Sequence, residues 1–335
     1  MVLSTYILAI ESSCDETSAA IIKDGKEEIA TVVLSQMDMH ANFGGVVPEI
    51  ASRMHIENIT LVLEDTLNKA GITMDDIDAI AVTYGPGLIG SLLIGLMAAK
   101  TLAFIYNKPL VPVHHLAGHI YANNLVKPLR YPLIALLVSG GHTDLFYMSE
   151  DYNFKRIGAT LDDAVGEAYD KVARVINVPY PGGPLVDKLA REGKDSYDLP
   201  IPLDDESYNF SFSGIKSAVI NLVHKEKQKG KAIIPEDMAC SFQNRCVSIL
   251  TKKTMRALKE YDCSNLIVAG GVAANSGLRE SLKKECQENN IILTIPEIKY
   301  CTDNAAMIGA AGYYAYKLGN IASLDLNAKA NIALK

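Results

Sequence analysis

The sequence contains no closely spaced pair of cysteines. Its six cysteines are scattered over the chain and form no CxxC motif. Zinc ribbons and small disulfide frameworks both depend on such spacings, so the pattern argues against either class.

The sequence also lacks the features of a signal peptide and of a membrane span. The N-terminal MVLSTYILAIESS has no basic stretch followed by a long apolar core. The most apolar run, LIGSLLIGLMAAKTLAFIY, contains glycines, a serine and Lys100, which is typical of a buried helix and not of a bilayer span. We therefore expect a cytoplasmic protein with no membrane partner.

Positive charge is not in excess. The chain has 32 Lys and Arg against 39 Asp and Glu, which gives a net charge of -7. Because nucleic-acid-binding domains are usually basic, the overall charge does not predict one, and contact with a nucleic acid would need a local basic strip. The 335 residues, nearly half of them hydrophobic, suffice for one large domain or two lobes.

Two segments follow the same plan. YILAIESSCDETSAAIIKDGK and YPLIALLVSGGHTDLFYMSED each read as an apolar strand, a turn of small and polar residues, and a second strand. Each therefore predicts a β-hairpin. From the pattern alone, an internal duplication and an accidental likeness explain the similarity equally well.

Elsewhere strands alternate with helices. Residues 78–84 and 109–113 are predicted strands joined by a buried helix over 88–106, and in NLIVAGGVAANSGLRE a strand and a glycine turn precede a helix that begins at Ser276. Residues 34–70 and 160–260 are predicted to be mostly helical. The sequence thus predicts an α/β fold with two similar lobes, and a cleft between such lobes is a common ligand site.

Three histidines occur together in VPVHHLAGHIYANNL. If the segment after Val113 is helical, His115 and His119 lie four residues apart on one face, where both imidazoles can reach one metal. A zinc protease would need a glutamate beside the first histidine, and none is present. The best third ligand is Asp303 in YCTDNAAMIGAAG, although spacing alone favours an ordinary helix N-cap at that position.

Two glycine turns, LVSGG and AGGVAAN, follow apolar strands. Such turns can direct backbone N–H groups at phosphate oxygens, and two of them favour a nucleotide site, although neither is a Walker A loop. In LDDAVGEAYDKVAR, helical spacing places Asp163, Glu167 and Asp170 on one face, where they bind ribose hydroxyls or, as the pattern favours, are simply solvated. Asp15 and Glu16 in the first hairpin turn are either functional or solvated.

Taken together, the segments resemble one family. AIESSCDET, FGGVVPEIASRMH, TYGPGLIGSLLIG, PVHHLAGHIYA, LLVSGGHT, DDAVGEAYDKVAR, YPGGP, FSFSGIKSA and AGGVAAN occur in order over nearly the whole chain. They are similar to the motifs of the TsaD family of bacterial tRNA adenosine threonylcarbamoyltransferases, once described as glycoprotein endopeptidases.

The resemblance implies an α/β fold of the acetate kinase, sugar kinase, Hsp70 and actin superfamily (ASKHA), with two duplicated lobes and helical insertions. Residues 1–128 would form the first lobe, with a helical arm at about 34–70 and a C-terminal helix at about 303–330 that completes it. Residues 129–302 would form the second lobe, with a helical insertion at about 160–260.

The resemblance also implies the site. His115, His119 and Asp303 would bind one Fe2+ per subunit, with zinc as the alternative metal, so it favours a ligand role for Asp303 over the N-cap. Asp15 and Glu16 would support catalysis. The implied substrate contacts are Leu137, Val138, Ser139, Gly140, Gly141, Asp170, Gly183, Asp187 and Asn275.

The implied reaction moves the threonylcarbamoyl group from threonylcarbamoyl-AMP to N6 of adenosine 37 in tRNAs that read codons beginning with A. The implied partners are a shorter paralogous ASKHA subunit (TsaB-like) and a small P-loop ATPase (TsaE-like). A metallopeptidase would lack its base, a sugar kinase would leave the HxxxH pair without a role, and a degenerate scaffold subunit need not keep all three ligand positions.

Overall fold

The structure is a computed structural model that describes residues 4–334. The chain divides into two compact units. Unit 1 contains the residues up to 129, residues 151–153 and the residues from 296 onward, and unit 2 contains residues 130–150 and 154–295. Within residues 4–334, no helix is both long enough and apolar enough to cross a bilayer.

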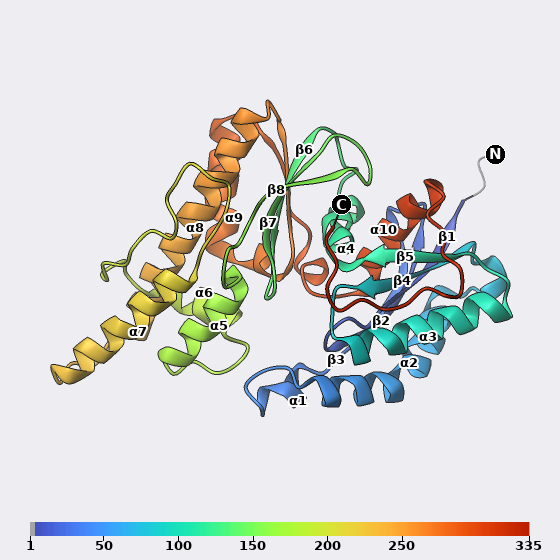
Figure 1. The fold of residues 1–335 in the computed structure, drawn as a ribbon, viewed down its shortest axis with the longest axis horizontal. Helices are drawn as coiled ribbons and strands as arrows, with labels where there is room; N and C mark the ends of the chain where they lie inside the picture. Colours follow the sequence, from blue (N-terminus) through green and yellow to red (C-terminus); the bar gives the residue numbers. More distant parts are fainter. Residues whose placement is uncertain (1–3, 335) are drawn as a thin grey trace. The chain divides into compact units, whose positions relative to one another are not determined.

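Unit 1 is built on a five-stranded sheet of order β3-β2-β1-β4-β5. β1 pairs antiparallel with β2, and it pairs parallel with β4. The parallel-paired strands β1 and β4 are almost wholly apolar because helices cover both faces of the sheet (Figure 1). Their bounds are Tyr6–Glu11 for β1, Glu16–Lys23 for β2, Glu27–Ser35 for β3, Ala79–Gly85 for β4 and Leu110–His114 for β5.

Successive residues of β1 face opposite helices, as the pleat of a strand requires. Leu8 and Ile10 join the core beneath α3, whereas Ala9 lies against Gly309 of α10, where an added Cβ would be 3.2 Å from the Ala9 side chain. The helices of unit 1 are α1 (Met37–Ala41), α2 (Pro48–Ala70), α3 (Ile89–Ile105), α4 (His115–Tyr121) and α10 (Ala305–Lys317), with 3-10 turns at Met74–Asp76, Ala122–Leu125 and Ile298–Tyr300.

Unit 2 repeats the plan of unit 1, with a sheet of order β10-β9-β6-β7-β8. Its first two strands again form an antiparallel hairpin, and β6 pairs parallel with β9. The strands are β6 (Leu133–Val138), β7 (Thr143–Met148), β8 (Phe154–Ala159), β9 (Asn265–Ala269) and β10 (Ile292–Thr294). The helices are α5 (Val165–Val175), α6 (Gly182–Glu192), α7 (Ser213–Gln228), α8 (Pro235–Glu260) and α9 (Ser276–Glu288), with a 3-10 turn at Gly271–Ala274.

Most predicted elements are present, and Pro48 begins α2 within the segment predicted to be helical. The strand that follows each first hairpin in the chain, β3 in unit 1 and β8 in unit 2, was not predicted. The helix expected at about 303–330 is shorter, because it ends at Lys317 and Gly319 follows with a positive φ of 77°. The chain then returns along the sheet, where Ala322 N donates to Leu110 O.

Candidate active site

The two predicted metal-binding histidines lie on α4 of unit 1, which begins directly after β5. His114 caps this helix by accepting a hydrogen bond from Leu116 N. His115 and His119 are both buried, and their ring centroids are 4.8 Å apart with the planes at 81°. The predicted helical spacing is therefore present, and His114 has a capping role.

Asp303 meets both histidines. Its Oδ1 lies 3.5 Å from His115 Nε2 and 3.1 Å from His119 Nε2. The N-cap of α10 is Asn304, whose side chain accepts from Met307 N, so the cap role that spacing favoured for Asp303 is wrong. Asp303 follows the 3-10 turn Ile298–Tyr300.

Glu11 contacts His115 at Nδ1, the ring nitrogen that does not face Asp303. It is fully buried at the end of β1, and its Oε2 lies 3.1 Å from His115 Nδ1 and accepts a 2.7 Å hydrogen bond from Thr83 Oγ1. Ser13 N donates to the other oxygen. A carboxylate on the far nitrogen of a ligand histidine fixes its tautomer and orientation. Sequence reasoning missed Glu11, although a charged residue that ends an apolar strand was a signal for it.

The electrostatics of this group suit a cation. Burial alone would lower the pKa of His115, but the Asp303 and Glu11 carboxylates raise it well above its ordinary value. Burial would raise the pKa of Asp303, yet the His115 imidazole holds it well below its ordinary value. One ligand atom from each of His115, His119 and Asp303 lies within 4.8 Å of the other two.

The donor set also fits a transition metal. Two imidazole nitrogens and one carboxylate oxygen suit Fe2+ and Zn2+ alike. Among residues 4–334, the buried Nδ1 of His119 has no hydrogen-bond partner, while Nε2 of the same ring lies 3.1 Å from Asp303 Oδ1. The three side chains are therefore a credible metal centre.

Asp15 and Glu16 lie in the hairpin turn of the same unit. Burial, followed by the charges of Asp303 and Asp15, raises the pKa of Glu16 to about 9. Glu16 therefore holds a proton at neutral pH and is poorly suited to act as a general base. Asp15 is buried next to it.

In unit 2, the turn after β6 lies against the start of α5. Gly166 N donates a 3.2 Å hydrogen bond to Ser139 O, and Ser139 N donates to His142 O. The side chains of Leu137 and Val138 are buried in the strand, so they can reach a substrate only through backbone atoms. Gly140 and Gly141 face open space, because an added Cβ would meet no atom within 4 Å.

Asp170 joins α5 to the start of α6. Its Oδ1 accepts from Gly182 N at 2.8 Å and from Gly183 N at 3.2 Å. Gly182 is tightly packed, whereas Gly183 again faces open space. Burial raises the pKa of Asp170 above its ordinary value, although the two glycine N–H groups oppose the shift.

Asp187 joins α6 to the start of α9. It accepts from Ser276 Oγ at 2.7 Å, from Gln243 Nε2 at 3.1 Å and from Arg191 Nη2 at 2.8 Å. Asn275 caps α9 and donates to Gln243 Oε1 at 2.8 Å. Gln243, which the sequence did not single out, thus connects two of the predicted substrate residues.

Asp163 and Glu167, the other two carboxylates expected beside Asp170, are engaged in ion pairs with lysines. Asp163 precedes α5 and pairs with Lys171 and Lys216, while Glu167 pairs with Lys171. Asp163 thus lies outside α5, and both carboxylates are ion-paired, whereas Glu167 and Asp170 keep their three-residue spacing within α5. All nine predicted substrate residues belong to unit 2, and the metal-centre residues belong to unit 1.

The sequence profile of one family, described as tRNA N6-adenosine threonylcarbamoyltransferase, matches residues 27–310. The chain belongs to this family. A tRNA N6-adenosine threonylcarbamoyltransferase of Staphylococcus carnosus is 61% identical over 332 residues, covering 99% of this chain and 97% of the relative. One of Staphylococcus aureus strain JH9 is 59% identical over 336 residues, covering 100% and 98%. The resemblance noted in the sequence is thereby confirmed.

The fold is shared more widely than the family. HypF of T. kodakarensis matches with a TM-score of 0.63 at 14% identity, over 96% of this chain and 49% of that one. The dehydratase component A of Acidaminococcus fermentans, which belongs to an (R)-2-hydroxyglutaryl-CoA dehydratase, matches at 0.54 and 16%, over 94% and 98%. These neighbours confirm the expected two-lobed ASKHA fold. As a tRNA N6-adenosine threonylcarbamoyltransferase, the chain is a transferase that acts on tRNA.

Proposed function

We propose that this transferase uses threonylcarbamoyl-AMP as its donor and adenosine 37 of tRNAs that read codons beginning with A as its acceptor. The products are N6-threonylcarbamoyladenosine at position 37 and AMP. The observation that supports this best is the convergence of His115 and His119 on one oxygen of Asp303, in a chain 61% identical to a named transferase.

The chemistry is acyl-type transfer. N6 of the adenosine attacks the carbamoyl carbon, the bond from that carbon to the phosphate oxygen breaks, N6 loses a proton and AMP leaves. Such a step needs two reactants held in line, and it needs stabilisation of the negative charge that develops on the carbonyl oxygen and on the leaving phosphate.

His115, His119 and Asp303 would hold one Fe2+, or Zn2+, per subunit. When bound, the metal would supply a Lewis acid for threonylcarbamoyl oxygens of the donor. Glu11 would keep His115 with its proton on Nδ1, so that Nε2 is free to act as a ligand. Ser13 Oγ, 3.1 Å from the same nitrogen, would hold the ring from a second direction.

Unit 2 would hold the AMP part of the donor. Its exposed glycine backbone at Gly140 and Gly141 leaves space for phosphate oxygens to approach N–H groups, and Gly183 leaves space for the donor beside Asp170. Asp170 uses Oδ1 for the α6 N–H groups, and its Oδ2 would accept from ribose hydroxyls. Asp187 and Asn275 are each held by several hydrogen bonds, so they would present ligand contacts in a fixed position.

Asp15 would accept the N6 proton, since Glu16 is itself protonated at neutral pH. An Asp15→Asn variant should then bind the donor normally but transfer it slowly. Normal turnover by this variant would remove Asp15 from the mechanism.

A paralogous subunit of the same fold would dock on unit 1, and a small P-loop ATPase would complete a cytoplasmic complex. Support comes from apolar side chains exposed on α2 and α3, at Ile56, Leu61, Ile89, Leu93, Met97, Phe104 and Ile105. Phe104 is 73% exposed, and large exposed apolar patches mark interfaces. Leu93→Lys with Met97→Lys should abolish co-elution with the paralogue, whereas Ile201→Lys with Ile234→Lys in unit 2 should not.

The reaction is tested by nucleoside mass spectrometry on tRNA from cells depleted of this protein and supplied with wild type or with His115→Ala/His119→Ala. Loss of threonylcarbamoyladenosine, restored by wild type alone, is expected. Rescue by the double variant would remove the histidines from the mechanism. Unchanged modification after depletion would overturn the proposed reaction.

A further inference from the structure

The end of α7 and the turn after it concentrate positive charge. This segment, residues 224–231, is called the basic tip. It has the sequence HKEKQKGK, and its four lysines, Lys225, Lys227, Lys229 and Lys231, are all exposed. One glutamate accompanies them in a chain whose net charge is -7, so the basic tip is a local reversal of the protein's overall sign.

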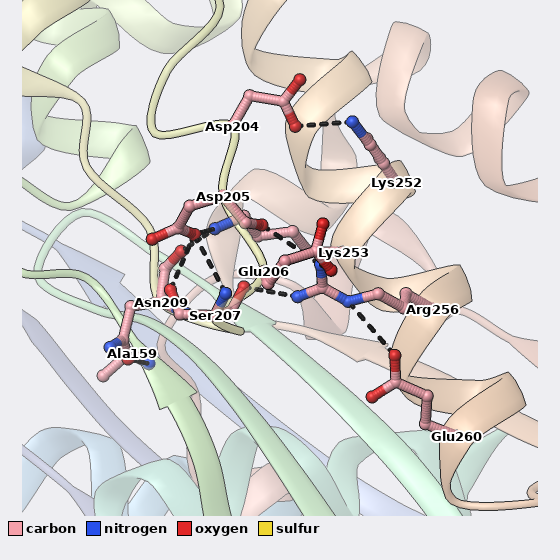
Figure 2. Close-up of polar contacts among 10 residues, drawn as sticks. All are labelled: Ala159, Asp204, Asp205, Glu206, Ser207, Asn209, Lys252, Lys253, Arg256 and Glu260. Atoms are coloured by element: carbon pink, nitrogen blue, oxygen red, sulfur yellow. Dashed lines mark hydrogen bonds and ion pairs between the residues drawn. The ribbon is translucent and has the colours of Figure 1, made fainter.

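The lysines of the basic tip are largely unneutralised. Lys229 pairs with Glu226 at 2.7 Å. Over residues 4–334, no carboxylate oxygen lies within 4.0 Å of the Nζ atoms of Lys225, Lys227 or Lys231. Elsewhere in unit 2, three cations of α8 are paired with acids: Lys252 with Asp204, Lys253 with Asp205, and Arg256 with Glu206 and Glu260 (Figure 2).

The helix that carries the basic tip is fixed at its base. Asp162 accepts hydrogen bonds from Phe212 N at 2.7 Å and from the N and Oγ atoms of Ser213 at 3.2 and 2.6 Å. One turn further on, Lys216 Nζ lies 2.6 Å from Asp163. These contacts satisfy the first N–H groups of α7 and set the direction in which it leaves the unit.

The segment before α7 is anchored as well. Lys253, whose side chain is 1% exposed, donates to Asn209 O at 2.5 Å and to Asp205 Oδ1 at 2.7 Å, as Figure 2 shows. In Figure 1, α7 extends outward from the rest of unit 2 towards its basic end. A solvated charge run needs no such support, whereas a binding surface benefits from a fixed position.

We propose that the basic tip binds backbone phosphates of the tRNA substrate. Lysines act as point charges on flexible stems, and several of them within seven residues match the density of charge along a nucleic-acid strand. The inference rests on the family's tRNA substrate and on the proposed reaction, and it adds the surface that meets the phosphates. Contact would be independent of sequence and would supply affinity and register.

The test measures kcat/KM for tRNA at several salt concentrations, using the full chain with its paralogous subunit and ATPase. The quadruple variant Lys225→Gln/Lys227→Gln/Lys229→Gln/Lys231→Gln should lower kcat/KM about tenfold at moderate salt. It should also lower the log–log salt slope by about three, because each lost phosphate contact removes about one. The value of kcat at saturating tRNA and the KM for the donor should not change.

Two matched variants separate the position of the lysines from the net charge of the protein. Replacing Lys194, Lys259, Lys283 and Lys284, four exposed lysines elsewhere in unit 2, with glutamine removes the same net charge and should leave the slope near wild type. The four lysine-to-arginine changes in the basic tip should also preserve it. Equal losses in the tip and control variants would overturn the proposal, because net charge alone would then account for the effect.

Other outcomes also decide the question. The quadruple variant could instead keep the wild-type salt slope but lose the paralogue or the ATPase on gel filtration. The basic tip would then bind an acidic surface of that protein, and the proposed tRNA contact would be overturned. If wild type transfers nothing, the proposed reaction fails. The basic tip is then judged by fluorescence anisotropy with labelled tRNA and the same variants, where the same fall in slope is expected.

Discussion

The two units share a sheet order and an antiparallel first hairpin, yet the turns of those hairpins differ in chemistry. The turn of unit 1 contains Asp15 and is flanked by Glu11 at the end of β1 and Glu16 at the start of β2, whereas the turn of unit 2 contains Ser139, Gly140 and Gly141. Carboxylates favour a nearby cation, and uncovered N–H groups favour an anion. The same backbone plan thus favours a cation in unit 1 and an anion in unit 2.

The surroundings extend this difference. In unit 1, α4 and the residue before α10's cap bring two imidazoles and a carboxylate together. In unit 2, Asp170 of α5 holds the start of α6, and Asp187 of α6 holds the start of α9. Helix N-termini favour negative ligands. Damage in one unit should therefore leave the other unit's ligand in place.

The largest effect is expected from Asp303→Ala. Loss of one of three ligands should empty the metal site, and the transfer rate should fall by a factor of about 10²–10³, as when a group that stabilises transition-state charge is removed. Elemental analysis and single-turnover transfer measure the two effects. Asp325→Ala, which removes an exposed carboxylate of unit 1, is the control, and full metal content with a full rate in Asp303→Ala would contradict the assignment.

The second prediction concerns unit 2 alone. Asp170→Ala should raise the dissociation constant of a non-hydrolysable adenylate by about 10- to 100-fold, the cost of losing hydrogen bonds to a charged group. Metal content should stay at the wild-type level. Calorimetry measures the affinity, and Asp163→Asn is the matched control because that carboxylate is already ion-paired. Equal weakening in both variants would show that α5 is merely perturbed.

Much of this comparison could be predicted from the sequence. Alternation of apolar strands with glycine or polar turns predicted both hairpins, and a four-residue spacing placed His115 and His119 together on one helix face. These are local patterns, which depend on residues close together in the chain. Asp303 was already the best candidate for a third ligand, and the resemblance to a family then favoured that role over the N-cap. No spacing rule could decide it, because Asp303 lies 188 residues from His115, the difference between positions 303 and 115.

Other features depend on distant contacts and left no local signal. The cap role suggested for Asp303 was wrong because the neighbouring Asn304 can also cap a helix, and the folded chain uses it. Gln243 lies in the middle of α8 and reaches Asp187 and Asn275 only through tertiary packing. Strand β3 is half-exposed and mixed in polarity, so its pattern was weaker than that of the buried strands.

The third prediction tests support of the metal centre. Glu11→Gln keeps the volume of the side chain but removes the charge behind His115, so metal affinity should fall by about tenfold or more. Competition with a chelator measures that affinity, and excess metal should restore transfer. Glu28→Gln removes a carboxylate of β3, in the same sheet as Glu11, that pairs with Lys299. This variant should leave metal affinity unchanged. Equal affinity in Glu11→Gln and wild type would show that Glu11 does not tune the ligand.

The smallest effect concerns Asp144, a buried carboxylate whose charge a nearby cation compensates only in part. Burial raises the pKa of Asp144 in β7 from 3.8 to about 6, and Arg156, 3.7 Å away, only partly offsets the shift. In unit 1 the opposite holds, because His115 lowers the pKa of Glu11 despite its burial. The hairpins therefore differ in whether a buried charge is compensated.

The sign of the Asp144 effect follows from proton binding. Between about pH 4 and pH 6 the folded state keeps a proton that the unfolded state has lost, so stability falls as pH rises through this range and stays lower above it. Asp144→Asn mimics the neutral form. It should raise the free energy of unfolding at pH 8 by about 2 kcal/mol, and by clearly less at pH 5. Urea denaturation at both values measures this, and an equal gain at pH 5 and pH 8 would mean that the buried charge is not its cause.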